Sequence, residues 1–323
     1  MPLSTRLSIA IVMAVAVCPV FADTARGQGA GRAVEATSLF GQPLYRPVPT
    51  GEALARMERE LAAAQRAYDH APTDPDSIIW LGRRLAYLGR YNDAIAKYSE
   101  GIAHHANDAR LYRHRGHRFI TVRRFADAIR DFERAASLVR GQPDEIEPDG
   151  QPNARNIPTS TLQSNIWYHL GLARYLTGDF EGALAAYREN MAVAKNPDMQ
   201  VAVSYWLYMT LRRLGRDAEA DRVLEPITAG MDIIENGSYH RLLLMFKGEL
   251  PTDSLLRDFD AGGGLDDVTT AYGVASWHLI NGRQSEAEAI LKRVLSARGQ
   301  WAAFGYIASE AELRRLGLAP PPQ

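Results

Sequence analysis

The sequence has almost no cysteine: a single one, Cys18, stands among 323 residues. It lies within residues 1–22, where Arg6 is the only charged residue and residues 7–17 form an apolar run. Such a stretch, ending at the small residue Ala22, is typical of a secretory signal that is cleaved after Ala22. The run is too short for a membrane-spanning helix, which needs about 20 apolar residues. A chain cleaved there has no thiol, which excludes disulfides, thiolate catalysis and cysteine metal sites.

Two alternatives to cleavage stay open. Residues 1–22 would serve as an uncleaved anchor, or Cys18 would carry the lipid of a bacterial lipoprotein. Residues 15–17 lack the leucine and the small residue that usually precede a lipidated cysteine, and Pro19 follows it. We expect an exported protein, periplasmic or secreted, which is anchored to an envelope membrane only if Cys18 is lipidated.

The sequence also lacks an excess of either charge. Its formal net charge is -1, from 37 Lys and Arg against 38 Asp and Glu. No global field therefore recruits nucleic acid or an anionic membrane, and any binding preference is local.

Catalytic motifs are missing as well. Residues 262–264 are glycines, but they follow no strand and lack the Lys-Ser/Thr sequel of a phosphate-binding loop. The sequence has no Gly-x-Ser-x-Gly elbow and no His-Glu-x-x-His pair, and strand-like alternation is absent outside the signal. We expect a non-catalytic helical protein without cofactor or metal.

What the sequence does have is a repeat of 34 residues between positions 75 and 142. The aligned pairs are Gly82 and Gly116, Tyr91 and Phe125, Ala94 and Ala128, Ile95 and Ile129, and Tyr98 and Phe132. A third copy carries Gly171, Phe180, Ala183, Leu184 and Tyr187 with the same internal spacing. Small residues stand where two helices cross closely, and the aromatic residues fill the space beside them.

These residues resemble the tetratricopeptide repeat (TPR), whose unit is a helix, a turn and a second helix. The resemblance implies an all-α, right-handed superhelix of about five to six units with helical caps, forming a single solenoid over residues 51–316. The predicted segments are a signal peptide (1–22), a flexible or extended segment (23–50), a half-repeat (51–74), unit one (75–108), unit two (109–142), an insert (143–163), unit three (164–197), unit four (201–234), a degenerate unit (235–267), a last unit (268–301), a cap (301–316) and a disordered tail (317–323).

The concave face of such a superhelix would be the binding groove, because fixed positions of each first helix point into it. The candidate groove residues are Arg83, Arg110, Arg113, His117, Asn165, Tyr168, Tyr175, Tyr205 and Arg212. Guanidinium groups bind carboxylates as planar forks, and tyrosines supply rigid contact area. We therefore expect a protein or peptide partner with an acidic or carboxyl-terminal end. The sequence leaves the oligomeric state open.

Other interpretations of these residues stay open. The arginines would pair with neighbouring carboxylates such as Asp127 and Asp131, or acidic residues of the insert would fold back and occlude the groove. Arg115 replaces the usual core leucine of a first helix, so its charge must be paired or pushed to the surface. His114 and His117 are three residues apart, but the flanking arginines argue against a metal site. The insert's acidic residues are Asp144, Glu145, Glu147 and Asp149.

The aromatic residues also allow two interpretations. They would form a platform that stacks on sugars, or the tryptophans would simply belong to the helix-packing core. The residues concerned are Trp167, Tyr168, Tyr175, Tyr205 and Trp206.

Residues 204–316 resemble the envelope lipoprotein family called new lipoprotein I. The resemblance is carried by SYWLYMTLRRLGRDAEADRVL, by MFKGELPTDSLLRDF and by YGVASWHLINGRQSEAEAILKRVL. Members of that family are TPR adaptors of Gram-negative bacteria that bring a periplasmic protease to murein hydrolases and scaffold cell-wall enzymes. The resemblance implies an exported adaptor or scaffold for envelope enzymes, and the alternative is a carbohydrate-contacting component of polysaccharide or peptidoglycan machinery. The chain departs from the family in its lipid-attachment site and in its insert.

Overall fold

The computed structural model describes residues 33–47, 50–257, 259 and 264–321. The predicted signal peptide, Cys18 and residues 262–263 lie outside these ranges. The strands are β1 (Val34–Thr37) and β2 (Pro43–Tyr45). The helices are α1 (Gly51–His70), α2 (Pro75–Tyr87), α3 (Tyr91–His104), α4 (Ala109–Thr121), α5 (Phe125–Val139), α6 (Leu162–Thr177), α7 (Phe180–Val193), α8 (Pro197–Arg213), α9 (Asp217–Leu224), α10 (Gly237–Phe246), α11 (Thr252–Leu256), α12 (Leu265–Ile280), α13 (Gln284–Ser296), the 3-10 turn η2 (Arg298–Gln300) and α14 (Phe304–Arg315).

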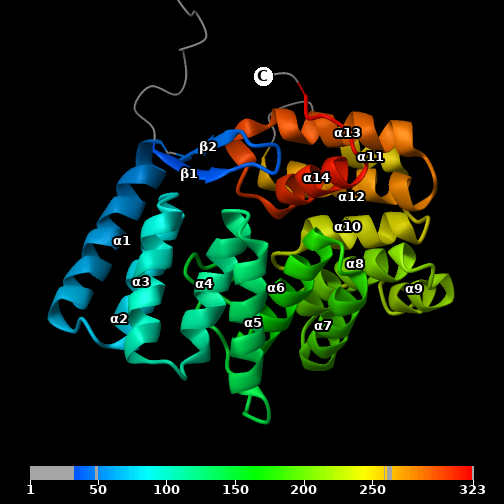
Figure 1. The fold of residues 1–323 in the computed structure, drawn as a ribbon. Helices are drawn as coiled ribbons and strands as arrows, with labels where there is room; N and C mark the ends of the chain where they lie inside the picture. Colours follow the sequence, from blue (N-terminus) through cyan, green and yellow to red (C-terminus); the bar gives the residue numbers. More distant parts are fainter. Residues whose placement is uncertain (1–32, 48–49, 258, 260–263, 322–323) are drawn as a thin grey trace, which may run out of the picture. The chain divides into compact units, whose positions relative to one another are not determined.

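The helices form consecutive pairs, each packed against the next (Figure 1). The regular pairs are α2 with α3, α4 with α5, α6 with α7, α8 with α9 and α12 with α13. The degenerate unit supplies the shorter helices α10 and α11. This arrangement confirms the prediction of an all-α solenoid of helix-turn-helix units.

Polar side chains set where the helices begin. Asp74 accepts the backbone N–H of Ser77 at 2.8 Å before α2, and Asp108 accepts that of Arg110 at 2.9 Å before α4. Thr161 forms a reciprocal capping box at the start of α6. Each side chain satisfies an N–H group that has no partner within its helix.

The glycines of the repeat are explained by close helix crossing. A Cβ atom on Gly82 would overlap the ring of Tyr98, and one on Gly116 would approach the ring of Phe132. The aromatic residue of each second helix therefore rests on the bare backbone of the first helix. This steric match is what the 34-residue spacing encodes.

The turn between the two helices of a unit uses a left-handed residue. Gly89 has φ 71° in unit one and Gly178 has φ 87° in unit three. In unit two the same position is Arg123, a non-glycine residue with φ 64°. A left-handed backbone costs a residue with a Cβ atom about 1–2 kcal/mol, so contacts of the Arg123 side chain must offset that cost.

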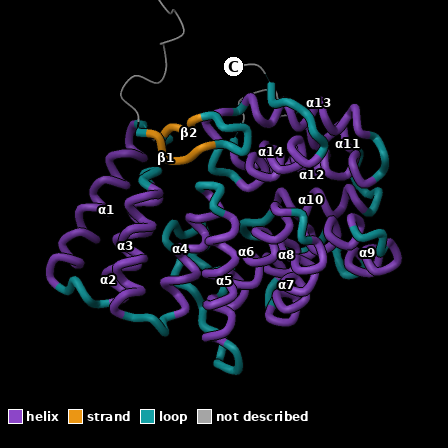
Figure 2. The backbone as a smooth tube through the Cα atoms, viewed as in Figure 1, coloured by secondary structure: helices purple, strands orange, loops and turns teal. Residues whose placement is uncertain are grey.

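The segment expected to be flexible or extended contains a β-hairpin, which corrects the expectation that no strand occurs outside the signal (Figure 2). Strands β1 and β2 pair antiparallel, and Ala36 and Leu44 are buried. Glu35 is also buried; it forms an ion pair with Arg46 at 2.6 Å and accepts the backbone N–H of Asn92 at 3.1 Å. These strands are too short, and one of their buried residues too polar, to give an alternating pattern.

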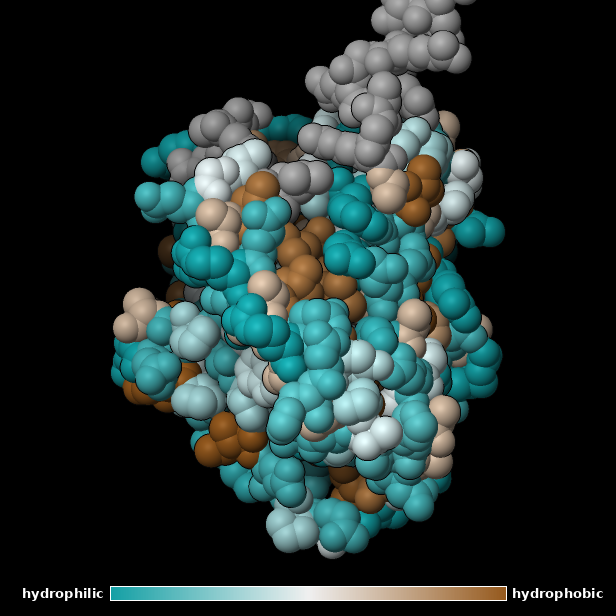
Figure 3. All heavy atoms as spheres, turned by 90° about the vertical axis from the view of Figure 1, so that its left-hand side faces the viewer, coloured by the Kyte–Doolittle hydropathy of each residue, from teal (hydrophilic) through white to brown (hydrophobic). Residues whose placement is uncertain are grey.

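Helix α1 closes the amino-terminal end of the solenoid. Ala64 is its only buried residue, and most of its other side chains are exposed. Figure 3 faces this end of the molecule and shows mostly hydrophilic side chains, with hydrophobic ones in separate patches. A polar outer face is what a terminal cap requires.

Helix α14 packs against α12 and α13 and also contacts α6 of unit three. Arg315 donates to the carbonyl of Tyr175 at 3.3 Å, and Trp301 donates from its indole to the carbonyl of Tyr45 at 2.7 Å. The carboxyl-terminal cap is thereby joined to earlier units and to the hairpin. No helix among the described residues is long and apolar enough to cross a membrane.

Candidate functional site

The candidate groove lies on the surface formed by α2, α4, α6 and α8, the first helices of units one to four, which we call the first-helix face. Its basic end meets the insert. Arg83 donates to the carbonyl of Pro148 at 2.8 Å, and Arg113 lies 2.9 Å from the carboxylate of Glu147. The Asn165 amide donates to the same carboxylate at 3.1 Å. Three candidate residues therefore converge on one acidic stretch of the chain itself.

Further contacts hold the insert at both ends. Arg84 donates to the carbonyl of Gly150 at 2.8 Å on the side of unit one. Arg155 forms a bidentate pair with Asp232, at 2.7 and 2.9 Å, in the loop between α9 and α10. Asp198 fixes that loop because its carboxylate accepts the backbone N–H groups of residues 234–236. The insert thus folds back and occludes the basic end of the groove, as one of the sequence interpretations foresaw.

The charges at this contact are desolvated. Burial lowers the pKa of Arg113, and the neighbouring carboxylate of Glu147 opposes that shift. Burial also lowers the pKa of His114 well below 6.5, and nearby arginines add to the effect. A neutral His114 accepts a hydrogen bond from Arg113 at 3.0 Å through Nδ1. Arg113 is therefore the cation that balances Glu147.

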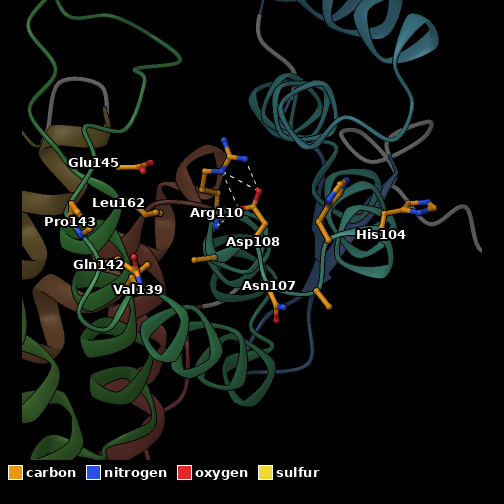
Figure 4. A pocket seen from close by; sticks show the side chains of 12 residues that line it. His104, Asn107, Asp108, Arg110, Val139, Gln142, Pro143, Glu145 and Leu162 are labelled. Atoms are coloured by element: carbon orange, nitrogen blue, oxygen red, sulfur yellow. Dashed lines mark hydrogen bonds and ion pairs between the residues drawn. The ribbon is translucent and has the colours of Figure 1, made fainter.

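Arg110 does not join this cluster. Its guanidinium pairs with Asp108 and with Asp76, each at 2.6 Å. It lines a separate cleft of about 590 Å³ between the α3–α4 turn and the start of the insert. Figure 4 shows Arg110 and Asp108 pointing toward one another, with Glu145 and Leu162 on the opposite side. The cleft is polar, and its guanidinium is already neutralised.

His117 and its neighbour His169 receive the carboxyl-terminal cap. The two rings lie 4.4 Å apart, and the ring of Phe304 lies 5.3 Å from His117 and 5.6 Å from His169. Burial lowers the pKa of His117 well below 6.5 and that of His169 to about 3. Both rings are thus neutral packing surfaces for α14. The sequence alone gives no signal that Phe304 contacts His117 and His169, which are far from it along the chain.

Tyr168 faces other helices as well. Its hydroxyl lies 2.9 Å from that of Tyr239 on α10 and accepts the indole N–H of Trp206 at 2.8 Å. The guanidinium of Arg212 lies 2.8 Å from Asp217 and donates to the hydroxyl of Tyr208 at 2.9 Å.

Two candidate residues belong to the core, which corrects their assignment to an accessible groove. Tyr175 is 1% exposed and Tyr205 is 0% exposed. Trp206 is 1% exposed, so these residues form no platform for sugars. The groove assignment assumed that the first-helix face is open to solvent, as in a solenoid of repeats alone. In the structure α10 packs over α8 and α14 over α6.

Two further arginines pair with neighbouring carboxylates, which is one of the alternatives that the sequence left open. Arg115 makes two hydrogen bonds of 2.7 Å to Asp131, and Arg124 donates to Asp127 at 2.6 Å. The anomalous Arg115 is therefore paired, as its position demanded. Among the described residues, no cluster of three or more His, Cys, Asp or Glu could hold a metal ion.

No protein-family model matches the sequence, and no curated protein matches it. Among solved structures, the chain is similar to MamA, with 14% identity, a TM-score of 0.41, and coverage of 63% of this chain and 100% of that one. It is similar to YrrB, a TPR protein with an unusual peptide-binding site, with 14% identity, a TM-score of 0.41, and coverage of 73% and 93%. A third similarity is to Naa15/Naa10 bound to HypK-THB, with 16% identity, a TM-score of 0.36, and coverage of 75% and 34%.

The class of the protein is defined by features of its own structure and sequence. The paired helices, the glycine-aromatic crossings and the 34-residue spacing define a TPR solenoid whose first-helix face is covered by other parts of the same chain.

Proposed function

We propose that the protein is an exported, non-catalytic TPR scaffold that binds another envelope protein through the first-helix face of units one to three. One observation carries the proposal: this face already grips an extended acidic polypeptide, the insert, through Arg83, Arg113 and Asn165. Export follows from the predicted signal in residues 1–22. The envelope setting follows from the resemblance of residues 204–316 to new lipoprotein I.

The contacts match the needs of peptide recognition. Arg83 and Arg84 bind backbone carbonyls, which every peptide has, whereas Arg113 selects a carboxylate. The hydrogen bonds that Arg83 and Arg84 donate are charge-assisted and therefore stronger than neutral ones, and Arg113 adds an ion pair. The insert competes as a tethered ligand at high effective concentration, so an acidic partner segment must displace it.

A peptide in trans tests the face directly. Residues 144–160 are replaced by a Gly-Ser linker, and a fluorescent peptide of residues 143–152 is titrated while its anisotropy is recorded. We expect saturable binding that weakens with salt and is lost in the Arg83→Glu, Arg113→Glu variant. Arg130→Glu is the matched control, because Arg130 is exposed and pairs only locally with Asp127. Absence of binding, or equal loss in the control, would contradict the proposal.

A capture experiment tests the biological setting. The linker variant and its Arg83→Glu, Arg113→Glu derivative are incubated with an envelope extract, and retained proteins are identified. Retention of a protease or cell-wall enzyme by the first protein alone supports an envelope adaptor. Equal retention by both proteins would place the interface elsewhere and refute this use of the first-helix face.

A further inference from the structure

An open apolar cleft lies away from the first-helix face, between α7, α8 and α9. Its volume is about 440 Å³, within the range of pockets that hold small ligands. The apolar side chains that line it are Met191, Ala194, Leu207, Leu211, Val223, Pro226 and Ile227. The polar side chains at the same cleft are Arg188, Gln200, Ser204, Glu219 and Arg222.

The sequence of unit four explains why this space exists. Ala183 and Ala220, at the same repeat position, are 37 residues apart instead of 34. Helix α9 has 8 residues, whereas the second helix of unit two, α5, has 15. The second helix therefore stops early, and the chain turns away at Pro226 instead of covering α8.

The equivalent space in unit two, between α3, α4 and α5, is filled by the chain itself. Arg115 makes hydrogen bonds to Asp131 at 2.7 Å and to Ser99 at 3.0 Å, and its guanidinium lies 5.8 Å from the ring of Tyr112. The residues of the cleft that align with Arg115, Asp131, Ser99 and Tyr112 are, in order, Leu207, Val223, Arg188 and Ser204. A tyrosine ring and a partly buried ion pair are thus replaced by a hydroxymethyl group and two aliphatic side chains, and Arg188 stands in place of Ser99.

The charges at the mouth of the cleft select the occupant. Arg188 pairs with Glu219 at 2.9 Å but is 54% exposed, and Glu219 also binds Arg216 at 2.6 Å. Arg222 is exposed and has no ion-pair partner among the residues that the structure describes. The mouth therefore offers cationic groups to a carboxylate beside an apolar floor.

We propose that this cleft is a second protein-binding site, which takes a large apolar or aromatic side chain flanked by acidic residues of a partner polypeptide. The partner's ring occupies the volume that Tyr112 and Arg115 fill in unit two, and its carboxylate pairs with Arg222. The site does not depend on the first-helix face. A scaffold with both sites holds two partners at once.

Methionine-methyl NMR tests the site, because the side chain of Met191 lies in the cleft. The protein is labelled at the methionine methyl groups and titrated with a short peptide that has one Phe between Glu and Asp residues. A second peptide has Lys at every acidic position. We expect a saturable shift of the Met191 signal with the acidic peptide, at least tenfold weaker binding of the basic one, and no shift of Met57 on α1.

Variants separate this site from a nonspecific effect and from the proposed function. Ser204→Tyr refills the cleft in the manner of Tyr112 and should abolish the shift. Arg222→Glu changes only an exposed side chain, so it tests the site even if Ser204→Tyr fails to fold, and it should reverse the preference between the two peptides. Arg83→Glu with Arg113→Glu should leave the titration unchanged.

Three results would overturn the proposal: no saturable shift of Met191, equal binding of both peptides, or full binding by folded Ser204→Tyr. A larger Met191 shift with dodecyl maltoside than with the acidic peptide would also overturn it, because the cleft would then hold an alkyl chain.

Discussion

The two halves of the first-helix face are covered in different ways. At units one and two the cover is the insert, a proline-containing loop whose contacts are arginines to carbonyls and to one carboxylate. At units three and four, and at His117 of unit two, the cover consists of helices α10 and α14, which bury aromatic rings. The same repeat surface is therefore held by polar contacts in one half and is part of the core in the other.

This difference predicts whether the insert or the carboxyl-terminal cap can be released from the first-helix face without unfolding the protein. Ile146 and Ile157 of the insert are 68% and 45% exposed, so the loop buries little apolar surface. Trp301 is 3% exposed and anchors the cap between the hairpin and unit two. Burying a large apolar side chain stabilises by about 1.5–3 kcal/mol, whereas a net hydrogen bond contributes about 1 kcal/mol. Release of the insert should leave the fold intact, and release of the cap should not.

The largest effect is expected at Arg123, which ties the cap to unit two. Its guanidinium donates to Glu310 at 3.0 Å and to the carbonyl of Trp301 at 2.7 Å, and the ion pair is buried, with 3% and 2% of the two side chains exposed. Arg123→Ala leaves a buried carboxylate without a partner and should lower the free energy of unfolding by about 3–5 kcal/mol. Urea denaturation followed by circular dichroism measures it.

The neighbouring Arg124 gives a matched control. It is the N-cap residue of α5, is 54% exposed and pairs with Asp127 in the first turn of that helix. Arg124→Ala should change the free energy of unfolding by less than about 0.5 kcal/mol. Adding Glu310→Gln to Arg123→Ala should recover part of the loss, because the unpaired charge is gone. An Arg123→Ala protein within about 1 kcal/mol of the parent would refute the anchoring role.

A second, smaller effect is the pH dependence of stability that arises at His169, whose ring packs against Phe304. Burial lowers the pKa of His169 to about 3, whereas the unfolded chain titrates near 6.5. Below about 6.5 the unfolded state binds a proton that the folded state does not, so stability is complete above that pH and falls as the pH drops. His169 alone should cost about 2 kcal/mol between pH 7 and pH 5. Urea midpoints at the two pH values measure the change.

His114 and His117 add to this dependence, because burial lowers both pKa values well below 6.5. Arg113 and Arg118 on the same helix act in the same direction, and Glu147 of the insert lies 3.8 Å from His114. His169→Gln should remove about one proton from the pH slope of stability. An identical slope in His169→Gln and the parent would contradict the buried, neutral state of this ring.

Much of the fold could be predicted because the repeat is encoded locally. A glycine and an aromatic residue within one unit, such as Gly82 and Tyr98, fix the crossing of two adjacent helices. The left-handed turn at Gly89 fixes where the first helix ends. These constraints involve neighbours in the sequence, so the period alone places the helices.

The cover of the groove could not be predicted in the same way. Tyr175 and Tyr205 stand at positions that face outward in an isolated repeat, and residues far along the chain bury them. The 34-residue spacing does not predict that α14 packs against α6. For Arg113 the sequence allowed two kinds of ion-pair partner, neighbouring carboxylates and acidic residues of the insert, and charge alone does not distinguish them. In the structure the partner is Glu147 of the insert.

The smallest effect on stability is expected at the insert itself. Arg83→Ala removes the hydrogen bond to the carbonyl of Pro148 and should lower the free energy of unfolding by about 1 kcal/mol or less. Cleavage within residues 143–160 by a nonspecific protease should nevertheless become several-fold faster, because local opening no longer has to break this contact. Mass spectrometry of the fragments measures the rate. Arg66→Ala, at an exposed position of α1, should change neither quantity. If Arg83→Ala destabilised the whole protein as much as Arg123→Ala, the insert would be part of the core and the contrast between the two covers would fail. Faster cleavage in an otherwise stable protein would establish the insert as the releasable cover.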